Sequence, residues 1–158
     1  MMKIELQRAT ITDAKIIYDM QIASFNSLLD KYQDFDTNPG AEPLEKVINR
    51  LNEQWTHFYI IYYERKTVGA VRIVLKDNGN RCRISPLFIL PEYQNKGIAQ
   101  EVFKIIETEY RPQNGWELDT ILEEQGNCHL YEKMGYKRTG EYKKINNRMT
   151  LVYYEKKA

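Results

Sequence analysis

The sequence predicts a mixed α/β domain in which helices return between the strands of a sheet. Segments rich in β-branched and aromatic residues recur along the chain, which is typical of strands. Between them, apolar residues repeat at the three- and four-residue spacing of helices, and clusters of Gly, Pro, Asn and Asp separate the segments. The 158 residues contain no repeat or linker and are enough for one buried core, so a single domain, 1–158, is expected.

The first half of the chain predicts a strand, two helices and a hairpin. The opening strand alternates apolar and polar residues, and the helix after it has a candidate cap at Thr12 or Asp13. A loop with Asn, Asp, Gly and two prolines precedes a second helix that has proline in its first turn. Two β-rich segments around the turn at residues 64–67 predict the hairpin. The expected elements are a strand at residues 3–9, helices at 10–32 and 43–55, and the two hairpin strands at 56–65 and 67–76, with the loop at 33–43.

The second half alternates strands and helices and closes with two strands. Its first strand contains Pro86, which cannot donate a ladder hydrogen bond and therefore implies a bulge or an unpaired edge. The next helix places Ile98, Val102 and Ile106 on one face, and the last helix stops at Gly135. The expected elements are a strand at residues 81–90, a helix at 97–110, a strand at 115–122, a helix at 127–135 and two strands at 136–144 and 147–157.

Composition and charge argue against several classes of function. Lys plus Arg total 23 against 22 Asp plus Glu, a balance that argues against a broad nucleic-acid or membrane surface. The N-terminus lacks the apolar segment of a signal peptide, and the longest apolar run, residues 58–63, is too short to span a bilayer. Cys82 and Cys128 form no CxxC motif and are expected to be reduced thiols of a cytoplasmic protein. His57 and His129 lie far apart, so no metal site is expected.

The segment that joins the strand at 81–90 to the following helix has the character of an anion site. The first turn of a helix leaves its N–H groups unpaired, and the helix dipole adds about half a positive charge there. Gly97 allows the backbone to approach a phosphate closely, the small side chain of Ala99 leaves room beside it, and Lys96 adds positive charge. The segment has neither the GxGxxG pattern nor the GK[ST] of a P-loop. The alternative is a plain strand-to-helix turn without a ligand.

Two motifs extend this interpretation. The residues QNKGIA, Gln94 to Ala99, match the Q/R-x-x-G-x-G/A signature of the GNAT superfamily of N-acetyltransferases. The preceding LFILPEY resembles the central strand of that family, and NCHLYEKMGYKRTG resembles its second motif, a helix that carries a tyrosine and ends in Gly-Phe or Gly-Tyr. The order of elements is also similar along the whole chain. The resemblance implies a mixed, mostly antiparallel central sheet, in which a bulged strand splays from its neighbour, with flanking helices and acetyl-CoA as co-substrate.

The resemblance also implies where the co-substrate binds. The main-chain N–H groups from Asn95 to Gln100 would bind the pyrophosphate, and the central strand would pair with the pantetheine arm. Asn127 and Tyr131 lie four residues apart and share one face of a helix, from which they would contact acetyl-CoA. The implied binding residues are Leu87, Phe88, Ile89, Gln94, Asn95, Lys96, Gly97, Ile98, Ala99, Gln100, Asn127 and Tyr131.

The implied reaction is direct attack of an amine on a thioester carbon. It needs a neutral amine, a polarised carbonyl and a proton for the departing thiolate. A main-chain N–H near Phe88 or Ile89 can stabilise the oxyanion. Tyr131 is the expected general acid, because the pKa of a phenol, about 10, is near that of an alkyl thiol. The alternative for Tyr131 is a tyrosine packed on a helix face with its hydroxyl in water.

The general base is less defined by sequence. Some members of the family carry a glutamate on the central strand, and here that position is Arg83, which accepts no proton. The candidates on and after the next strand are four carboxylates that could act through water, and each could equally be an ordinary solvated side chain. They are Glu117, Asp119, Glu123 and Glu124. Cys128 is expected to be inert, and His129 is expected to be structural or solvated.

The acceptor is expected between the loop at 33–43 and the last hairpin. Asp34, Asp36 and Glu42 in the loop could receive a cationic amine, or they could be solvated. The hairpin carries cationic side chains that would favour an acceptor with a carboxylate or phosphate, at Lys143, Lys144 and Arg148. Because these two hints conflict, the sequence predicts an amine acceptor, small molecule or protein, without naming it.

Other readings stay open. The chain could transfer another acyl group, or it could be a non-catalytic acyl-CoA-binding sensor or regulatory module of the same fold. A domain that binds ATP or NAD is a third reading. No nucleic-acid or membrane partner is expected, and homodimerisation is compatible with the sequence.

Overall fold

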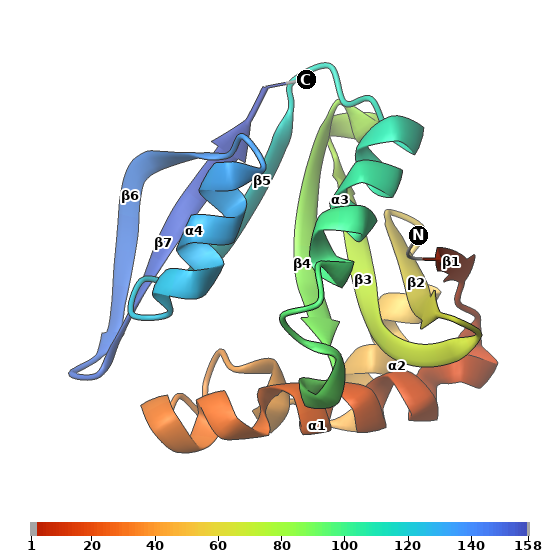
Figure 1. The fold of residues 1–158 in the computed structure, drawn as a ribbon, viewed down its shortest axis with the longest axis horizontal. Helices are drawn as coiled ribbons and strands as arrows, with labels where there is room; N and C mark the ends of the chain where they lie inside the picture. The colour runs from red at the N-terminus through yellow and green to blue at the C-terminus, as the bar shows by residue number, and fades with distance from the viewer. Residues whose placement is uncertain (1–2, 158) are drawn as a thin grey trace.

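A seven-stranded sheet forms the middle layer of the protein, as the computed structural model, which describes residues 3–157, shows (Figure 1). The strand order is β1-β2-β3-β4-β5-β7-β6; β4 and β5 are parallel and every other neighbouring pair is antiparallel. This confirms the predicted fold class. The strands are β1 (Ile4–Arg8), β2 (Thr56–Tyr63), β3 (Lys66–Lys76), β4 (Arg81–Ile89), β5 (Trp116–Ile121), β6 (Lys137–Asn146) and β7 (Met149–Lys156).

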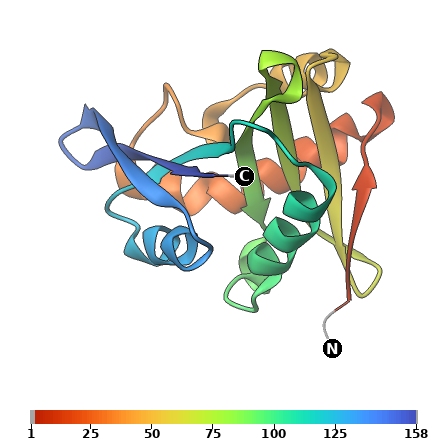
Figure 2. The ribbon, with the colours of Figure 1, turned by 90° about the horizontal axis from the view of Figure 1, so that it is seen from above.

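Two helices cover each face of the sheet. The helices are α1 (Ala14–Tyr32), α2 (Leu44–Asn52), α3 (Ile98–Glu109) and α4 (Gln125–Lys133). Helices α1 and α2 pack through Ile17 and Val47 on one apolar cluster, while α3 and α4 pack on a second cluster on the other face (Figure 2). The layers follow from amphipathic helices that bury one stripe each on a sheet. No helix among residues 3–157 is both long enough and apolar enough to cross a membrane.

The element order agrees with the sequence, and the differences lie at the ends of elements, as in the last hairpin, where β6 runs to Asn146 and β7 begins at Met149. Helix α2 ends at Asn52 instead of residue 55, and α4 begins at Gln125, two residues earlier than expected. Asp13 lies at the N-terminus of α1 as predicted, but its carboxylate accepts from the Thr10 N–H at 2.9 Å instead of capping α1. The predicted domain bounds, 1–158, include residues 1–2 and 158, which lie outside the described residues.

The predicted bulge at Pro86 is present. In the β3–β4 ladder, Val71 pairs with Leu87 and Ile73 pairs with Ile84, so a single residue of β3 lies opposite two residues of β4. That residue is Arg72, whose Nε donates to the Ser85 carbonyl at 2.5 Å. The bulge reverses the alternation of side chains along β4, since one extra residue shifts the pleat.

Strands β4 and β5 diverge after a short pairing. They pair only at Cys82 with Trp116 and at Arg83 with Glu117, beside a hydrogen bond from the Cys82 N–H to the Gly115 carbonyl at 3.1 Å. From there the two strands separate toward α1 (Figure 1). Among residues 3–157, the splayed arrangement leaves the edge of β4 that faces β5 without a partner strand over Ser85 to Ile89.

Candidate functional site

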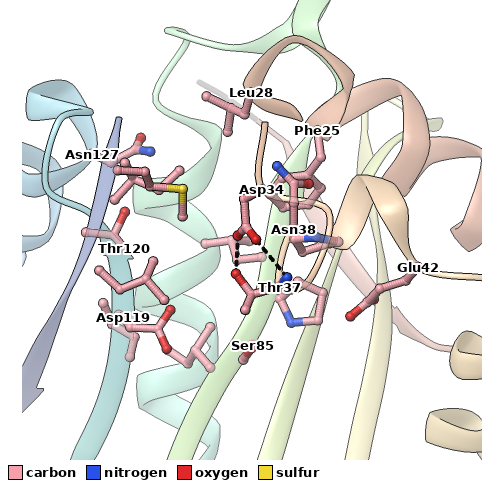
Figure 3. Close-up of a pocket in the computed structure, with 18 of the residues that line it drawn as sticks. Phe25, Leu28, Asp34, Thr37, Asn38, Glu42, Ser85, Asp119, Thr120 and Asn127 are labelled. Carbon is pink, nitrogen blue, oxygen red and sulfur yellow. Dashed lines mark hydrogen bonds between the residues drawn. The ribbon is translucent and has the colours of Figure 1, made fainter. Parts of the chain in front are cut away.

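A cavity of about 260 Å³ lies where β4 and β5 separate. Its walls come from both strands, from α1, from the loop between α1 and α2, from α4 and from β7. Figure 3 shows Asp34 and Asn38 of the loop, Ser85 of β4 and Asp119 of β5 around it. The cavity therefore brings together segments that are far apart in the sequence, including the predicted pair Asn127 and Tyr131.

Tyr131 lines the cavity from α4, and aromatic neighbours hold its ring. The ring packs edge-on against Phe103 and Tyr136, with centroids 5.7 and 6.4 Å away, and tilted against Tyr154 at 6.2 Å. Within residues 3–157 its hydroxyl makes no hydrogen bond, unlike those of Tyr136 and Tyr154, which bond to glutamates. The hydroxyl is therefore available to a molecule in the cavity.

Burial controls the ionisation of Tyr131. Loss of contact with water, followed by the charges of Asp119 and Cys128, raises the pKa of Tyr131 to about 12. The phenol therefore stays protonated throughout the physiological pH range, as a proton donor requires.

The four carboxylates considered as general bases occupy different places. Asp119 lines the cavity, and Glu117, on the same face of β5, is held by Lys76 at 2.9 Å and Arg81 at 3.1 Å. Burial by itself raises the pKa of Glu117, but hydrogen bonds from these two cations outweigh it and lower the pKa below its ordinary value. Glu123 accepts from the Thr150 N–H at 2.9 Å. Of the four, only Asp119 is in the wall of the cavity.

Glu124 joins α4 to the end of α1 and is expected to stabilise the fold in a pH-dependent way. It accepts hydrogen bonds from the Tyr32 hydroxyl and from Lys31, the latter at 2.8 Å. Burial by itself raises the pKa of Glu124, but these two bonds outweigh it and lower the pKa. A carboxylate with a depressed native pKa stabilises the fold above its unfolded pKa, and this contribution is lost as the pH falls through the native value.

We therefore expect Glu124→Gln to lower the free energy of unfolding at pH 7. The deficit relative to wild type should shrink as the pH falls below about 4, because the wild-type carboxyl is then protonated as well. Urea unfolding at a series of pH values measures it. Glu123→Gln is the matched control, because Glu123 has no cation partner within residues 3–157. A deficit of equal size at every pH would contradict this role.

The loop between α1 and α2 forms a fixed wall. Glu42 accepts from Arg50 at 2.8 and 3.0 Å and from Gln21 at 2.9 Å. Asp34, only 2% exposed, accepts from the N–H groups of Asp36 and Thr37 at 3.2 and 3.0 Å and from the Thr37 hydroxyl. Asp34 and Glu42, two of the three carboxylates expected to bind the amine, line the cavity, but their hydrogen bonds hold the loop together.

Other expected acceptor residues lie elsewhere. Asp36 is exposed and does not line the cavity. Lys143 and Lys144 are exposed on β6, and the Arg148 guanidinium donates to the Lys31 carbonyl at 3.5 Å. The hairpin instead contributes apolar side chains, Met149 and Leu151, to the wall. Arg50 was missed, because a single arginine in an amphipathic helix carries no motif.

The turn after β4 presents a row of N–H groups. Asn95 and Gly97 have positive φ angles of 62° and 82°. Within residues 3–157, none of the six N–H groups from Asn95 to Gln100 donates a hydrogen bond; the first to do so is that of Glu101, to the Gly97 carbonyl at 3.3 Å. Lys96 is exposed, and Ile98 is buried in the core beside this turn. The row fits the predicted anion site.

Gln94 has a different part in this turn. Its N–H donates to the Pro91 carbonyl at 3.2 Å, and its side-chain amide donates to the Ile89 carbonyl at 2.9 Å. These bonds fix the exit of β4 relative to α3. Ala99 and Gln100, in the first turn of α3, are partly buried.

The three expected strand residues face different sides. The Leu90 N–H donates to the Val68 carbonyl at 2.7 Å, so strand alternation directs the N–H groups of Leu87 and Ile89 away from β3, toward β5. The side chain of Phe88 lies in the α1 and α2 cluster, with its ring 5.8 Å from that of Phe25. Of the two N–H groups considered for the carbonyl, that of Ile89 therefore faces the gap.

The histidines and cysteines considered in the sequence do not line the cavity. His129 is exposed, and His57 shares a hydrogen bond of 2.6 Å with Tyr110 away from the cavity. Cys82 and Cys128 are both free, and the Cys128 thiol lies 3.7 Å from the Ile121 carbonyl oxygen. In the described part of the chain, no group of three or more His, Cys, Asp and Glu side chains is arranged to hold a metal ion.

Comparison with known proteins is consistent with this architecture. Among solved structures, the spermidine N-acetyltransferase from Vibrio cholerae, in complex with CoA and spermine, is 18% identical with a TM-score of 0.75 over 96% of this chain and 94% of that chain. The PaiA N-acetyltransferase from Thermoplasma acidophilum, in complex with coenzyme A, is 16% identical with a TM-score of 0.74 over 99% and 100%. An acetyltransferase from Salmonella typhimurium that modifies the N-terminal serine of a 50S ribosomal subunit protein is 12% identical with a TM-score of 0.76 over 98% and 95%.

These likenesses establish the fold. The sequence also matches the model of the acetyltransferase (GNAT) domain over residues 19–158, most of the chain. The splayed strands, the N–H row at the start of α3 and the tyrosine of α4 lie within that match. This chain therefore belongs to the GNAT acetyltransferase family.

Proposed function

We propose that this protein transfers an acetyl group from acetyl-CoA to a primary amine of a small molecule or a protein, with Tyr131 as the general acid. The observation that carries the proposal is the cavity between β4 and β5, which Tyr131 lines and which is bordered by the unpaired edge of β4. Acetyl-CoA, when bound, supplies the activated thioester. Solved structures of the same fold hold CoA, and in one case spermine with it, which supports this choice of reactants.

The N–H row from Asn95 to Gln100 is the proposed pyrophosphate site. Six neighbouring donors have no partner in the described chain and can therefore donate to an anion, which the dipole of α3 also favours at this end. Gly97 permits the left-handed turn that aims these donors outward. Lys96, exposed beside the row, adds a positive charge.

The unpaired edge of β4 is the proposed site of the pantetheine arm. Leu87 and Ile89 direct their N–H groups toward the gap, so an extended amide chain can add to this edge as a strand would. The N–H of Ile89 would donate to the thioester carbonyl and favour attack at its carbon. Asn127 lines the cavity beside Tyr131 and would contact the same arm.

Tyr131 is proposed to give its proton to the departing thiolate. Its ring is held by Phe103, Tyr136 and Tyr154, so the hydroxyl is positioned before substrate binds. With a pKa of about 12 it is fully protonated when the thiolate departs and so holds a proton that it can donate.

A screen of amines tests the proposal. Acetyl-CoA should raise the melting temperature of the protein, whereas ATP and NAD should not. Thiol release from acetyl-CoA should then appear with at least one member of a panel of diamines, polyamines, amino sugars and peptides with free N-termini. Binding without release for every amine would favour a non-catalytic sensor, and faster release from a longer acyl-CoA would favour another acyl group. Stabilisation by ATP but not by acetyl-CoA would refute the proposal.

A further inference from the structure

We infer that Asp119 is the general base that takes the proton of the acceptor amine, and that Arg83 holds it in place. The inference rests on the proposed function and deepens it, since it assigns the second proton-transfer group of the same site. Asp119 lies on β5 in the wall of the cavity, with its carboxylate shown in Figure 3 across the gap from Ser85 of β4.

Asp119 and Tyr131 approach the cavity from opposite faces of the sheet. Trp116 and Leu118 of β5 pack into the cluster beneath α3 and α4, so the intervening alternation turns Asp119 toward the α1 and α2 face. Tyr131 packs on the cluster beneath α3 and α4. A thioester lying in the gap would thus have a carboxylate on one side and a phenol on the other. The base acts on the attacking nitrogen and the acid on the departing sulfur, so this separation lets each group reach its own atom.

Arg83 fixes the carboxylate of Asp119 from the neighbouring strand. Its guanidinium donates one N–H group to Oδ2 of Asp119 and another to Glu117 at 3.2 Å. Oδ1 of Asp119 makes no hydrogen bond within residues 3–157, so this oxygen can accept a proton from a ligand or a bridging water. Arg83 therefore acts as a positioning residue.

The charges around Asp119 are compatible with this task. The titratable groups that bond to Asp119, neighbour it in the sheet or line the same cavity are Arg83 on β4, Glu117 on β5, Tyr153 on β7, Tyr131 on α4, Asp34 and Glu42 on the loop and Arg50 on α2. Arg83 neutralises one of the two β5 carboxylates only in part, because it is shared between them. Glu117 is also paired with Lys76 and Arg81, so cations balance both carboxylates, and the Asp119 oxygen that an incoming ammonium group can meet is the unbonded Oδ1.

The proposed step is balanced as follows. The ammonium group of the acceptor loses one proton to Asp119, and its nitrogen lone pair forms a bond to the thioester carbon. The C–S bond breaks, and the thiolate takes the proton of Tyr131. The nitrogen loses its second proton to solvent as the amide forms, and Tyr131 regains one proton from solvent. The proton on Asp119 is then released to solvent. The net products are the amide, the free thiol and one proton.

The test compares pH profiles of acetyl transfer to an amine found in the screen. Asp119→Asn is expected to lower kcat/KM for the amine about 100-fold near pH 7. The loss should shrink as the pH approaches the pKa of the acceptor amine, because a neutral amine needs no base. The dissociation constant of acetyl-CoA should stay within about twofold of wild type. A merely structural role of Asp119 would give a loss that does not depend on pH.

Matched variants separate the outcomes. Glu123→Gln removes a carboxylate that follows β5 but lies outside the cavity and contacts neither Arg83 nor Asp119, and should leave the pH profile unchanged. If Asp119→Asn does not fold, the double variant Arg83→Gln with Asp119→Asn leaves no unpaired buried charge and is measured instead. If the wild type turns over and the Asp119→Asn variant turns over equally fast, this inference is refuted while the proposed function stands. No thiol release by wild type with any amine refutes the proposed function and the inference together.

Discussion

Tyr131→Phe should lower kcat for acetyl transfer by about 100- to 1,000-fold while leaving the dissociation constant of acetyl-CoA unchanged. The phenyl ring keeps its contacts with Phe103, Tyr136 and Tyr154, so the change removes only the hydroxyl. Because this hydroxyl makes no hydrogen bond within residues 3–157, its loss leaves no buried partner unsatisfied. The effect should therefore fall on proton donation and not on stability.

Steady-state kinetics and calorimetric titration of acetyl-CoA measure these two quantities. Tyr110→Phe is the matched control, because Tyr110 is also partly buried but does not line the cavity, and its hydroxyl bonds to His57 and Tyr59 at 2.6 Å. That variant should lose stability and keep its kcat. An unchanged rate for Tyr131→Phe would assign the proton of the thiolate to water.

Gly97→Val should weaken acetyl-CoA binding by at least 100-fold. The φ angle of Gly97 is 82°, a region that a β-branched residue avoids, so the turn must change shape. A shift of the turn misaligns the N–H row, and each hydrogen bond to a charged group contributes about 1.5–3 kcal/mol. The loss of two such bonds is enough for this change in affinity.

Backbone strain by itself also costs stability, so a control is needed. Gly79 has a φ angle of 89°, and a Cβ atom added there would meet nothing within 4 Å. Gly79→Val should therefore carry a similar strain of about 1–3 kcal/mol, while acetyl-CoA binds as in wild type. Thermal unfolding and titration of both variants compare the two effects. Retention of acetyl-CoA affinity by Gly97→Val would place the pyrophosphate elsewhere.

Much of the fold was predictable because its signals are local. Alternation along β2 and β3, helical spacing in α3 and the clusters of Gly, Pro and Asn between them depend only on neighbouring residues. Pro86 likewise predicted the bulge, since proline lacks the N–H that a ladder needs. Helix ends were less accurate, as the early start of α4 shows, because packing decides where a helix frays.

The carboxylates of the site were not predictable from sequence. Asp34 and Glu42 look like solvated loop residues, yet one is buried under three hydrogen bonds and the other is paired with Arg50. Glu117 and Asp119 lie two residues apart on one strand, so they share a face and have the same local pattern. Only the point at which β4 leaves β5 decides that Asp119 reaches the cavity while Glu117 does not.

The sequence by itself indicated the family and located both the turn at Gln94 to Ala99, which is proposed to bind an anion, and the tyrosine of the later helix, since each is carried by a short motif with its own backbone chemistry. The tertiary structure alone decided which side chains meet around the cavity and from which face each approaches. That outcome depends on strand register and on the divergence of β4 from β5, which long-range packing sets and no local pattern encodes.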